Sequence, residues 1–516
     1  MTEALASFCP DFTHRRVTVM GLGRFGGGVG AVQFLLDRGA AVTVTDVLTA
    51  EELAESLAQI DVDRLEALHL GGHCEIDFIA ADLIVVNPAI RRDHSMLQVA
   101  RDAGVPLSSE MNLFWQLRRG PVIGVTGSNG KSTTTALIHS ILTAAGRTAH
   151  LGGNIGGSLL PRIDEIGPDD WTVLELSSFQ LQDLDRLPSS PEIAVVTNFA
   201  PNHLDWHGCL EEYRRAKQAT LRWQPPNGIG VLNADDPEVS TWCHHGWCYF
   251  FGRADHGAPG VYLRNDDTLL LRRGGLYDGL PTRSRIRENS AERSSHSRIL
   301  TNSATTSDGL GRPSYGAEEE SIPVWTDLPI VGEHNLYNAM AAAAVALALG
   351  ISTDAIELGL RRFKPLPHRL QFVGEWDGRR FYNDSLATTP ESVCAALDSF
   401  TEPIVLLAGG YDKGIDLSGL AERIVSHTKA AALMGTVSPL LDELIEARRT
   451  SPVPRTRRCE DFEAAFRWAV EESEPGDVVL LSPGCASYDW FANFAERGER
   501  FTQLVRQLQR AGMPVG

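Results

Sequence analysis

The sequence has few of the features that mark a secreted or membrane-inserted protein. Its 8 cysteines are scattered over 516 residues and form no disulfide framework, which suits a reducing compartment. Residues 1–16 hold no apolar stretch like that of a signal peptide. The most apolar run, residues 339–349, is too short and too rich in alanine to cross a bilayer. These absences predict a cytoplasmic protein without membrane insertion.

Positive charge is also in short supply. Lys and Arg number 47 against 66 Asp and Glu, which gives a net charge of −19. Binding to nucleic acid needs a basic surface that releases counterions, so we expect no nucleic-acid partner. Nucleotides and other small phosphorylated ligands remain compatible, because a few cationic side chains and backbone N–H groups can hold a phosphate in an acidic protein.

One short segment resembles a metal site, with Cys243, His244, His245 and Cys248 close together. No second cysteine or histidine pair follows at zinc-finger spacing. We therefore predict no metal at this segment.

Three segments of the chain alternate short β-branched runs with helical stretches, a pattern typical of parallel α/β sheets. The length also favours about three domains. We place the boundaries near Gly120 and Pro367, which gives domains over residues 1–120, 121–366 and 367–516. Residues 281–323 are poor in apolar side chains, and we interpret them as a flexible, solvated insertion rather than a partner-binding arm. The expected strands are residues 17–20, 41–45, 83–86, 122–125, 172–174, 194–197, 404–408 and 478–481.

A glycine motif follows the first expected strand. Gly21, Gly23 and Gly26 precede a helix that should end near Gly39, and Asp46 stands at the tip of the next strand. Glycines at this spacing admit a pyrophosphate, and the acid accepts ribose hydroxyls. The motif predicts a Rossmann-like domain that binds a nucleotide diphosphate. It fits an NAD-dependent dehydrogenase or an enzyme with a UDP-linked substrate equally well.

A second glycine loop follows the strand expected at residues 122–125 and precedes a long helix. Strand, glycine loop, Gly-Lys-Ser and helix form a phosphate cradle, in which Lys131 neutralises charge and Ser132 or Thr133 ligates Mg²⁺. The strict P-loop spacing is missed, because Val125 stands where the first glycine belongs. The predicted nucleotide-binding residues of the loop are Gly127, Ser128, Asn129, Gly130, Lys131, Ser132 and Thr133.

The loop GSNGKS resembles the GTNGK[ST] loop of the Mur ligase family, and further resemblances follow in order along most of the chain. They are closest to the members that add glutamate. One departure is Asn202, which stands where the family has an aspartate. The matching segments are residues 152–156 (GGNIG), 175–181 (ELSSFQL), 198–205, 213–217 (YRRAK), 332–338, 367–369, 383–385, 408–413 and 481–487.

This resemblance implies an α/β protein of three domains: an N-terminal Rossmann-like domain for the UDP substrate, a central P-loop ATPase domain with a parallel sheet, and a C-terminal Rossmann-like domain for the amino acid. It also implies the reaction. ATP phosphorylates the carboxylate of UDP-N-acetylmuramoyl-L-alanine, and the amine of glutamate attacks the acyl phosphate, in peptidoglycan precursor synthesis. We expect a monomer.

The resemblance further implies the roles of individual residues. Lys131, Glu175, His203 and Lys217 are the expected catalytic set. Two Mg²⁺ ions would be held by Ser132, Glu175, His203 and Lys217, the last as a carbamate formed from a partly deprotonated amine. The remaining assignments are Asn335, Asn338, Arg369 and Asp384 for ATP, Asn154 and Ser177 for the UDP substrate, and Thr388, Lys413, Ser487 and Phe494 for glutamate.

Another departure concerns the amino acid. Leu386 stands where the members that add D-glutamate have a lysine, and leucine cannot pair with a carboxylate. D-glutamate remains our prediction, and L-glutamate is the alternative. Folylpolyglutamate synthase would not explain the N-terminal nucleotide motif. An inactive binding protein would not explain why all four expected catalytic residues are present.

Overall fold

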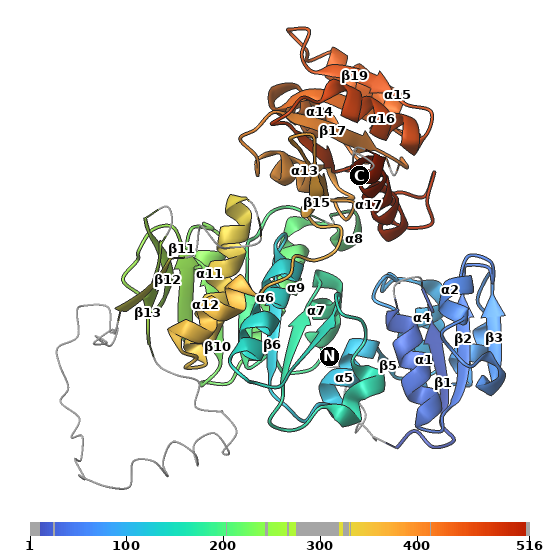
Figure 1. Ribbon diagram of the computed structural model, residues 1–516. Helices are drawn as coiled ribbons and strands as arrows, with labels where there is room; N and C mark the ends of the chain where they lie inside the picture. Colours follow the sequence, from blue (N-terminus) through green and yellow to red (C-terminus); the bar gives the residue numbers. More distant parts are fainter. Residues whose placement is uncertain are drawn as a thin grey trace, which may run out of the picture. The chain divides into compact units, whose positions relative to one another are not determined.

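The computed structural model describes residues 11–23, 26–202, 204–242, 246–265, 268–274, 319–323, 330, 332–412 and 414–511. Three α/β sheets follow one another along the chain, coloured blue, green and orange to red in Figure 1. The predicted three-domain α/β fold is therefore confirmed. All eight expected strands are present, and their bounds shift by at most about one residue.

The first sheet has five parallel strands in the order β3-β2-β1-β4-β5. Its central strand, β1, is buried along four of its five residues, as expected for a strand covered on both faces. The elements are β1 (Arg16–Met20), α1 (Gly27–Asp37), β2 (Ala41–Asp46), α2 (Ala54–Leu57), η1 (Val62–Arg64), β3 (Ala67–Leu70), α3 (Glu75–Ile79), β4 (Leu83–Val86), α4 (Ser95–Asp102), β5 (Leu107–Ser108) and α5 (Glu110–Leu117).

The second sheet has nine strands in the order β14-β13-β12-β11-β10-β9-β6-β8-β7. Its strands β6 and β8 are buried at every residue. The elements are β6 (Val122–Thr126), α6 (Lys131–Ala144), β7 (Ala149–Gly153), η2 (Leu160–Glu165), β8 (Trp171–Glu175), α7 (Ser178–Leu184), β9 (Ile193–Val196), α8 (Leu204–His207), α9 (Leu210–Arg222), β10 (Ile229–Asn233), η3 (Val239–Thr241), β11 (Trp247–Gly252), β12 (Gly260–Asn265), β13 (Thr268–Arg272), β14 (Glu319–Pro323), α11 (Glu333–Ala348) and α12 (Thr353–Arg361).

The predicted insertion at residues 281–323 is wrong at its C-terminal end. Glu319–Pro323 form strand β14, which pairs antiparallel with β13 and buries Ile322 completely. The segment has a single large apolar residue, so its composition resembles that of a loop, and only the partner strand makes it β structure. The rest of the predicted insertion, residues 281–318, lies outside the described residues.

The third sheet has six strands in the order β15-β16-β20-β17-β18-β19, and only β15 runs antiparallel to its neighbour. The elements are β15 (Gln371–Trp376), β16 (Arg379–Asn383), α13 (Pro390–Leu397), β17 (Ile404–Gly409), α14 (Ser418–His427), β18 (Thr428–Met434), α15 (Ser438–Glu446), β19 (Arg455–Arg458), α16 (Phe462–Glu472), β20 (Val478–Leu481) and α17 (Phe494–Ala511).

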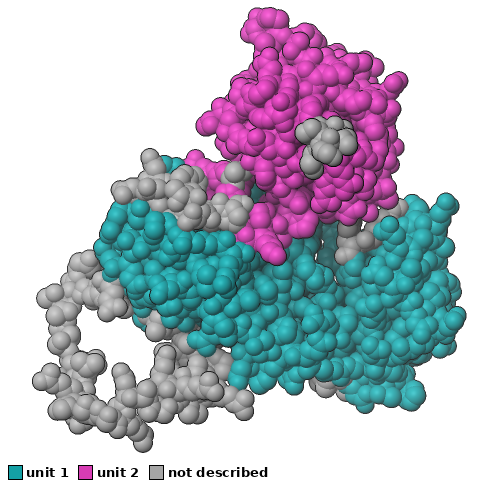
Figure 2. Space-filling model, viewed as in Figure 1, with its two compact units in different colours: residues 1–326, 337–362 teal, residues 327–336, 363–516 magenta. Residues whose placement is uncertain are grey.

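The chain divides into two compact units, residues 1–326 with 337–362 and residues 327–336 with 363–516 (Figure 2). The first two sheets belong to one unit because they share a hydrophobic core, in which Phe34 and Leu35 of α1 belong to the same cluster as Leu159 and Leu160. Within the described part of the chain, no helix is both long and apolar enough to cross a membrane.

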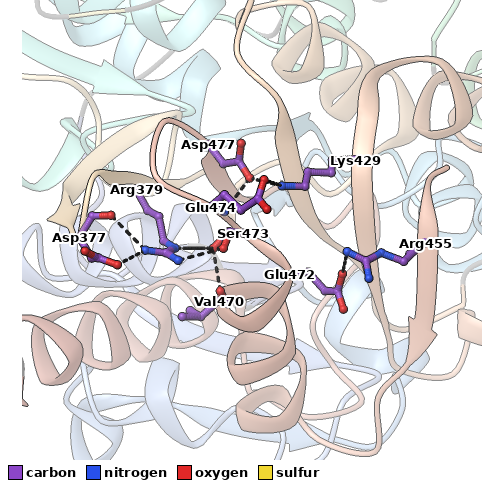
Figure 3. A network of polar contacts seen from close by, with 9 residues as sticks. All are labelled: Asp377, Arg379, Lys429, Arg455, Val470, Glu472, Ser473, Glu474 and Asp477. Carbon is purple, nitrogen blue, oxygen red and sulfur yellow. Dashed lines mark hydrogen bonds and ion pairs between the residues drawn. The ribbon is translucent and has the colours of Figure 1, made fainter.

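Ion pairs and hydrogen bonds connect residues at the amino ends of strands in the third sheet (Figure 3). Arg379 donates to the carbonyl oxygen of Ser473 at 3.0 Å and to its hydroxyl at 3.1 Å. Lys429 pairs with both Glu474, at 2.7 Å, and Asp477, at 2.9 Å. These contacts lie at the edge opposite the carboxyl ends of the parallel strands, where α/β proteins place their ligands.

The two carboxylates that share Lys429 should differ in their contribution to stability. Asp477 has a side chain that is 6% exposed and also accepts from the backbone N–H of Glu474, whereas the side chain of Glu474 is 77% exposed. We expect Asp477→Ala to lower the free energy of unfolding by about 2–4 kcal/mol, because it leaves the Glu474 N–H without its acceptor and the Lys429 ammonium with only an exposed carboxylate. Glu474→Ala should cost less than about 1 kcal/mol. Urea denaturation of both variants measures this, and equal losses would contradict it.

Candidate active site

The second glycine loop lies between β6 and the start of α6. Gly127 and Gly130 have positive φ angles of 147° and 81°, which favour glycine. A Cβ atom on Gly127 would lie 1.9 Å from the hydroxyl of Thr197, and one on Gly130 would lie 2.3 Å from the side-chain oxygen of Asn338. The loop therefore needs glycine at both positions to fit against its neighbours, and helix α6 begins directly at Lys131.

Residues after β9 brace this loop. The hydroxyl of Thr197 donates to the carbonyl oxygen of Asn129 at 2.6 Å. The side chain of Asn198 accepts from the Asn129 N–H at 2.8 Å and donates to its carbonyl oxygen at 3.1 Å. The sequence analysis assigned neither residue a role. Their position just after a strand of the same parallel sheet was the available signal.

Two lysine side chains converge on the carbonyl oxygen of Gly127. Lys131 donates to it at 3.1 Å and to the carbonyl oxygen of Ser128 at 2.8 Å, and Lys217 donates to it at 2.6 Å. Lys217 is 1% exposed. Burial, and secondly the charge of Lys131, hold the pKa of Lys217 well below its usual value, while Glu175 opposes the shift. The site therefore makes loss of a proton from Lys217 easier than it would be in water.

Glu175 ends the fully buried strand β8 and is 1% exposed. One carboxylate oxygen accepts from the side-chain amide of Asn154 at 3.2 Å, and the Asn154 N–H donates to the Glu175 carbonyl oxygen at 3.0 Å. The other carboxylate oxygen is buried without a hydrogen-bond partner. A buried carboxylate oxygen without a donor is costly, and a cation would satisfy it.

The metal set predicted from the sequence is only partly within the described residues. Ser132 is buried in the first turn of α6, while His203 lies outside the described residues. In the described ranges, no three His, Cys, Asp or Glu side chains gather as a metal site would need. Glu175 is thus the carboxylate of this site whose surroundings fit a hard cation.

Tyr213 links the two lysine-bearing elements, although the sequence analysis gave it no role. Its hydroxyl lies 3.1 Å from the hydroxyl of Ser128, and the Lys217 amine lies 4.8 Å from the centre of its ring. The signal was its spacing, since residues four apart share one face of a helix. The pKa of Tyr213 is raised by burial.

Helix α11 contributes the two predicted asparagines. Asn338 is buried and accepts from the hydroxyl of Thr134 at 3.1 Å, so it lies against the first turns of α6. Asn335 is also buried, in the first turn of α11. The structure therefore brings Asn338 to the phosphate loop, while its predicted contact with ATP stays a prediction.

The three glycines of the first motif share one feature of backbone conformation. Gly21, Gly23 and Gly26 all have positive φ angles, between 65° and 87°. Asp46 is 4% exposed, and its carboxylate accepts from the backbone N–H groups of Gly23, at 3.1 Å, and Leu48, at 2.9 Å. Asp46 therefore ties the loop to β2. Asp46 therefore has a structural role in addition to the ligand contact that the motif predicts.

Ser177, a predicted substrate residue, caps helix α7. Its hydroxyl accepts from the Gln180 N–H at 3.2 Å, and the Gln180 side chain accepts from the Ser177 N–H at 2.9 Å. This reciprocal pair is a capping box, which satisfies two free donors at a helix start.

In the second unit, Asp384 is 6% exposed at the carboxyl end of β16. It accepts from the hydroxyl of Ser482 at 2.7 Å and from the Leu370 N–H at 3.1 Å. Burial raises its pKa to about 7, and the hydrogen bonds and the charge of Arg369 only partly oppose this. The structure thus places Arg369 close enough to Asp384 for its charge to act on the carboxyl group. Both residues were predicted to contact ATP.

Two of the predicted glutamate residues, Thr388 and Ser487, lie on the loops that follow β16 and β20 at this edge of the third sheet. Ser487 is 2% exposed, and its hydroxyl is buried without a hydrogen-bond partner. Phe494 begins α17 and accepts through its carbonyl oxygen from the Ser385 hydroxyl at 2.7 Å. Thr388 is half-buried, and Lys413 lies outside the described residues.

Arg497 joins the two loops that carry Thr388 and Ser487, and the sequence analysis missed it. Its guanidinium is buried and donates to the hydroxyl of Ser385 at 2.9 Å and to the carbonyl oxygen of Cys485 at 3.2 Å. Burial lowers its pKa to about 10. The sequence carried no signal for it, because an arginine on an amphipathic helix is usually solvated.

Family models match all three parts of the chain. Residues 15–109 match the MurD-like N-terminal domain of Mur ligases, residues 125–257 match the Mur ligase middle domain, and residues 368–485 match the glutamate ligase domain of Mur ligases.

The chain is also similar to curated proteins over nearly its whole length. It is 37% identical over 497 residues to UDP-N-acetylmuramoylalanine--D-glutamate ligase of Symbiobacterium thermophilum, which covers 96% of this chain and 98% of that protein. It is 36% identical over 504 residues to the ligase of the same name from Geobacillus kaustophilus, covering 96% and 99%.

Two solved structures from Thermotoga maritima share the fold. UDP-N-acetylmuramate-alanine ligase MurC has a TM-score of 0.57 at 15% identity, with 96% of this chain and 100% of that chain covered. MurF ligase in complex with ADP has a TM-score of 0.51 at 17% identity, with 97% of both chains covered. With full-length relatives above 30% identity and three matching domain models, the chain belongs to the Mur ligase family.

Proposed function

We propose that this protein is an ATP-dependent ligase that adds D-glutamate to UDP-N-acetylmuramoyl-L-alanine through an acyl phosphate, in peptidoglycan precursor synthesis. The observation that carries the proposal is the pair Lys131 and Lys217 on one carbonyl oxygen beside the buried Glu175. The names of the full-length relatives support the same reaction. Membership of the Mur ligase family excludes a dehydrogenase. The phosphate loop at residues 127–133 would also have no use in hydride transfer.

The chemistry requires positive charge between two anions. A carboxylate must attack the γ-phosphorus of ATP, and both reactants carry negative charge. We assign residues 127–133 to the phosphates, with Lys131 moving from its two loop carbonyl oxygens to the phosphate oxygens. An ammonium fixed in a buried site stabilises such a transition state more than it would in water. Asn335, Asn338, Arg369 and Asp384 complete the proposed ATP contacts.

Glu175 and Ser132, with His203 and a carbamate on Lys217, would hold two Mg²⁺ ions. When bound, these ions would neutralise phosphate charge and polarise the P–O bond. The unpartnered oxygen of Glu175 and the lowered pKa of Lys217 support this assignment, because the first needs a cation and the second gives the neutral amine that adds CO₂.

Substrate contacts are assigned to both units. Gly21, Gly23, Gly26 and Asp46 would hold the UDP moiety, and Asn154 and Ser177 the muramoyl part. Thr388, Lys413, Ser487 and Phe494 would hold glutamate, with the buried hydroxyl of Ser487 free to donate to a carboxylate. We further propose that the three sheets correspond to domains divided near Gly120 and Pro367, and that the enzyme is a cytoplasmic monomer.

Lys131→Ala should abolish ligation without unfolding the protein. Loss of one fixed charge at the transferring phosphate should lower kcat at least about 100-fold. The measurement is phosphate release from ATP with UDP-N-acetylmuramoyl-L-alanine and D-glutamate, with thermal unfolding as a check on the fold. Lys364→Ala, at an exposed lysine of the other compact unit, is the control and should retain activity. Near-normal turnover by Lys131→Ala would contradict the proposed function.

Lys217→Ala should also be severely impaired, and added acetate should restore part of its activity. A small carboxylate can occupy the space of the missing carbamate and replace its charge. Lys131→Ala is the control here, because acetate cannot replace a cation and should not rescue it. Full activity of Lys217→Ala without acetate would contradict the carbamate.

The enzyme should prefer D- to L-glutamate in kcat/KM despite Leu386, which is half-buried next to Thr388. Leu386→Lys should change KM for glutamate more than KM for ATP, because it adds a cation beside the proposed amino-acid site. Leu440→Lys, at a leucine that is 43% exposed in the same unit, should change neither. A clear preference for L-glutamate would overturn the stereochemical assignment.

A further inference from the structure

Glu110 stands where the first sheet passes into the second. It is the first residue of α5, two residues after the end of β5. The strands of this sheet are parallel, so the carboxyl end of β5 lies at the same edge as the glycine loop after β1 and Asp46 at the end of β2. Glu110 therefore follows the edge to which the UDP moiety is assigned.

The partner of Glu110 comes from the second sheet. The hydroxyl of Ser158 donates a short hydrogen bond to a carboxylate oxygen of Glu110 and accepts from the Leu160 N–H at 3.2 Å. Helix α1 packs on the same serine, since a Cβ atom on Gly30 would lie 2.4 Å from the Ser158 Cβ. Ser158 is thus held between α5 and the helix that begins at the first glycine loop.

Ser158 directly follows the loop that carries Asn154. At its start this loop is bound to Glu175 through the backbone and side chain of Asn154, at 3.0 Å and 3.2 Å. At its end it is bound to Glu110 through Ser158. The loop is therefore fixed between the catalytic carboxylate and the nucleotide edge of the first sheet, and all of these residues lie in one compact unit.

The hydrogen bond from Ser158 is the main contact that offsets the cost of burying the Glu110 carboxyl group. Burial raises the pKa of Glu110 to about 7, and the hydrogen bond from Ser158 is the one opposing influence. In the described part of the chain, no charged side chain shifts it. Glu110 is partly exposed as a whole residue, and the hydrogen bond from Ser158 is the polar contact that stabilises its carboxyl group.

We propose that Glu110 is a positioning residue, acting through Ser158, for UDP-N-acetylmuramoyl-L-alanine. This substrate accepts the phosphoryl group of ATP and is called the acceptor below. The contact fixes the Asn154 loop relative to the glycine loop of the first sheet. It thereby sets the separation between the site of the diphosphate and the site of the reacting carboxylate beside Glu175. A misplacement of such a loop weakens binding of the one substrate that spans both sites and leaves ATP and glutamate unaffected. This inference rests on the proposed function.

The test compares Glu110→Ala, Ser158→Ala and their double variant with the wild-type enzyme. We expect KM for UDP-N-acetylmuramoyl-L-alanine, and its Kd by calorimetry without ATP, to rise about fivefold in each single variant, as for the loss of one partly buried hydrogen bond. KM for ATP and for glutamate should stay within about twofold. The double variant should be no worse than the poorer single variant, because the two residues act through one contact.

Two further variants separate positioning from general destabilisation. Glu110→Gln can still accept from Ser158 and should restore the wild-type KM for the acceptor. Glu66→Ala, at an exposed glutamate of the first sheet's region, is the matched control and should change nothing. If Glu110→Ala does not fold, the comparison of Glu110→Gln with Ser158→Ala still decides the matter.

The outcomes distinguish the inference from the function on which it rests. Unchanged acceptor KM and Kd in Glu110→Ala and Ser158→Ala, or an equal rise in KM for all three substrates, would overturn the inference while the wild-type enzyme still ligates. Absence of acceptor binding and of ligation in the wild-type enzyme would overturn the proposed function and the inference together.

Discussion

The central constraint of this structure is that two amines meet at one carbonyl oxygen, that of Gly127. Two ammonium ions so close repel each other, and one of them is fully buried. The arrangement is tolerable when the buried amine of Lys217 gives up its proton, which burial and the charge of Lys131 both favour. The phosphate loop is thus built around a buried lysine with a lowered pKa, and its remaining contacts keep that lysine in place.

Several elements serve this constraint. Tyr213 places its ring beside Lys217 and its hydroxyl beside Ser128, so the helix that carries the lysine is fixed to the loop. Thr197 and Asn198 hold the opposite side of the loop. Glu175 lies on the neighbouring strand with one oxygen bound to Asn154 and the other lacking a donor. The site therefore combines a braced anion cradle with an unsatisfied anion, which is the charge pattern that ATP with a divalent cation would complete.

The second unit uses a different arrangement at the carboxyl ends of its parallel strands. Its buried arginine, Arg497, donates to a hydroxyl and to carbonyl oxygens, and so it orders two loops. Asp384 lies at the same edge, where burial raises the pKa of its carboxyl group to about 7. The opposite edge holds paired charges instead, such as Lys429 with Asp477. The separation of functional and structural polar groups follows from the direction of the parallel strands.

The sequence by itself determined the fold class, the eight expected strands, both glycine loops and the family, because short buried strands and glycines that need positive φ leave local signals. It did not determine β14, since Glu319–Pro323 carry one large apolar residue and become a strand only by pairing with β13. Nor did it determine the roles of Thr197, Tyr213, Glu110 or Arg497. Those side chains act on partners that lie far along the chain, so only the tertiary structure decided which atoms they meet and how deeply they are buried.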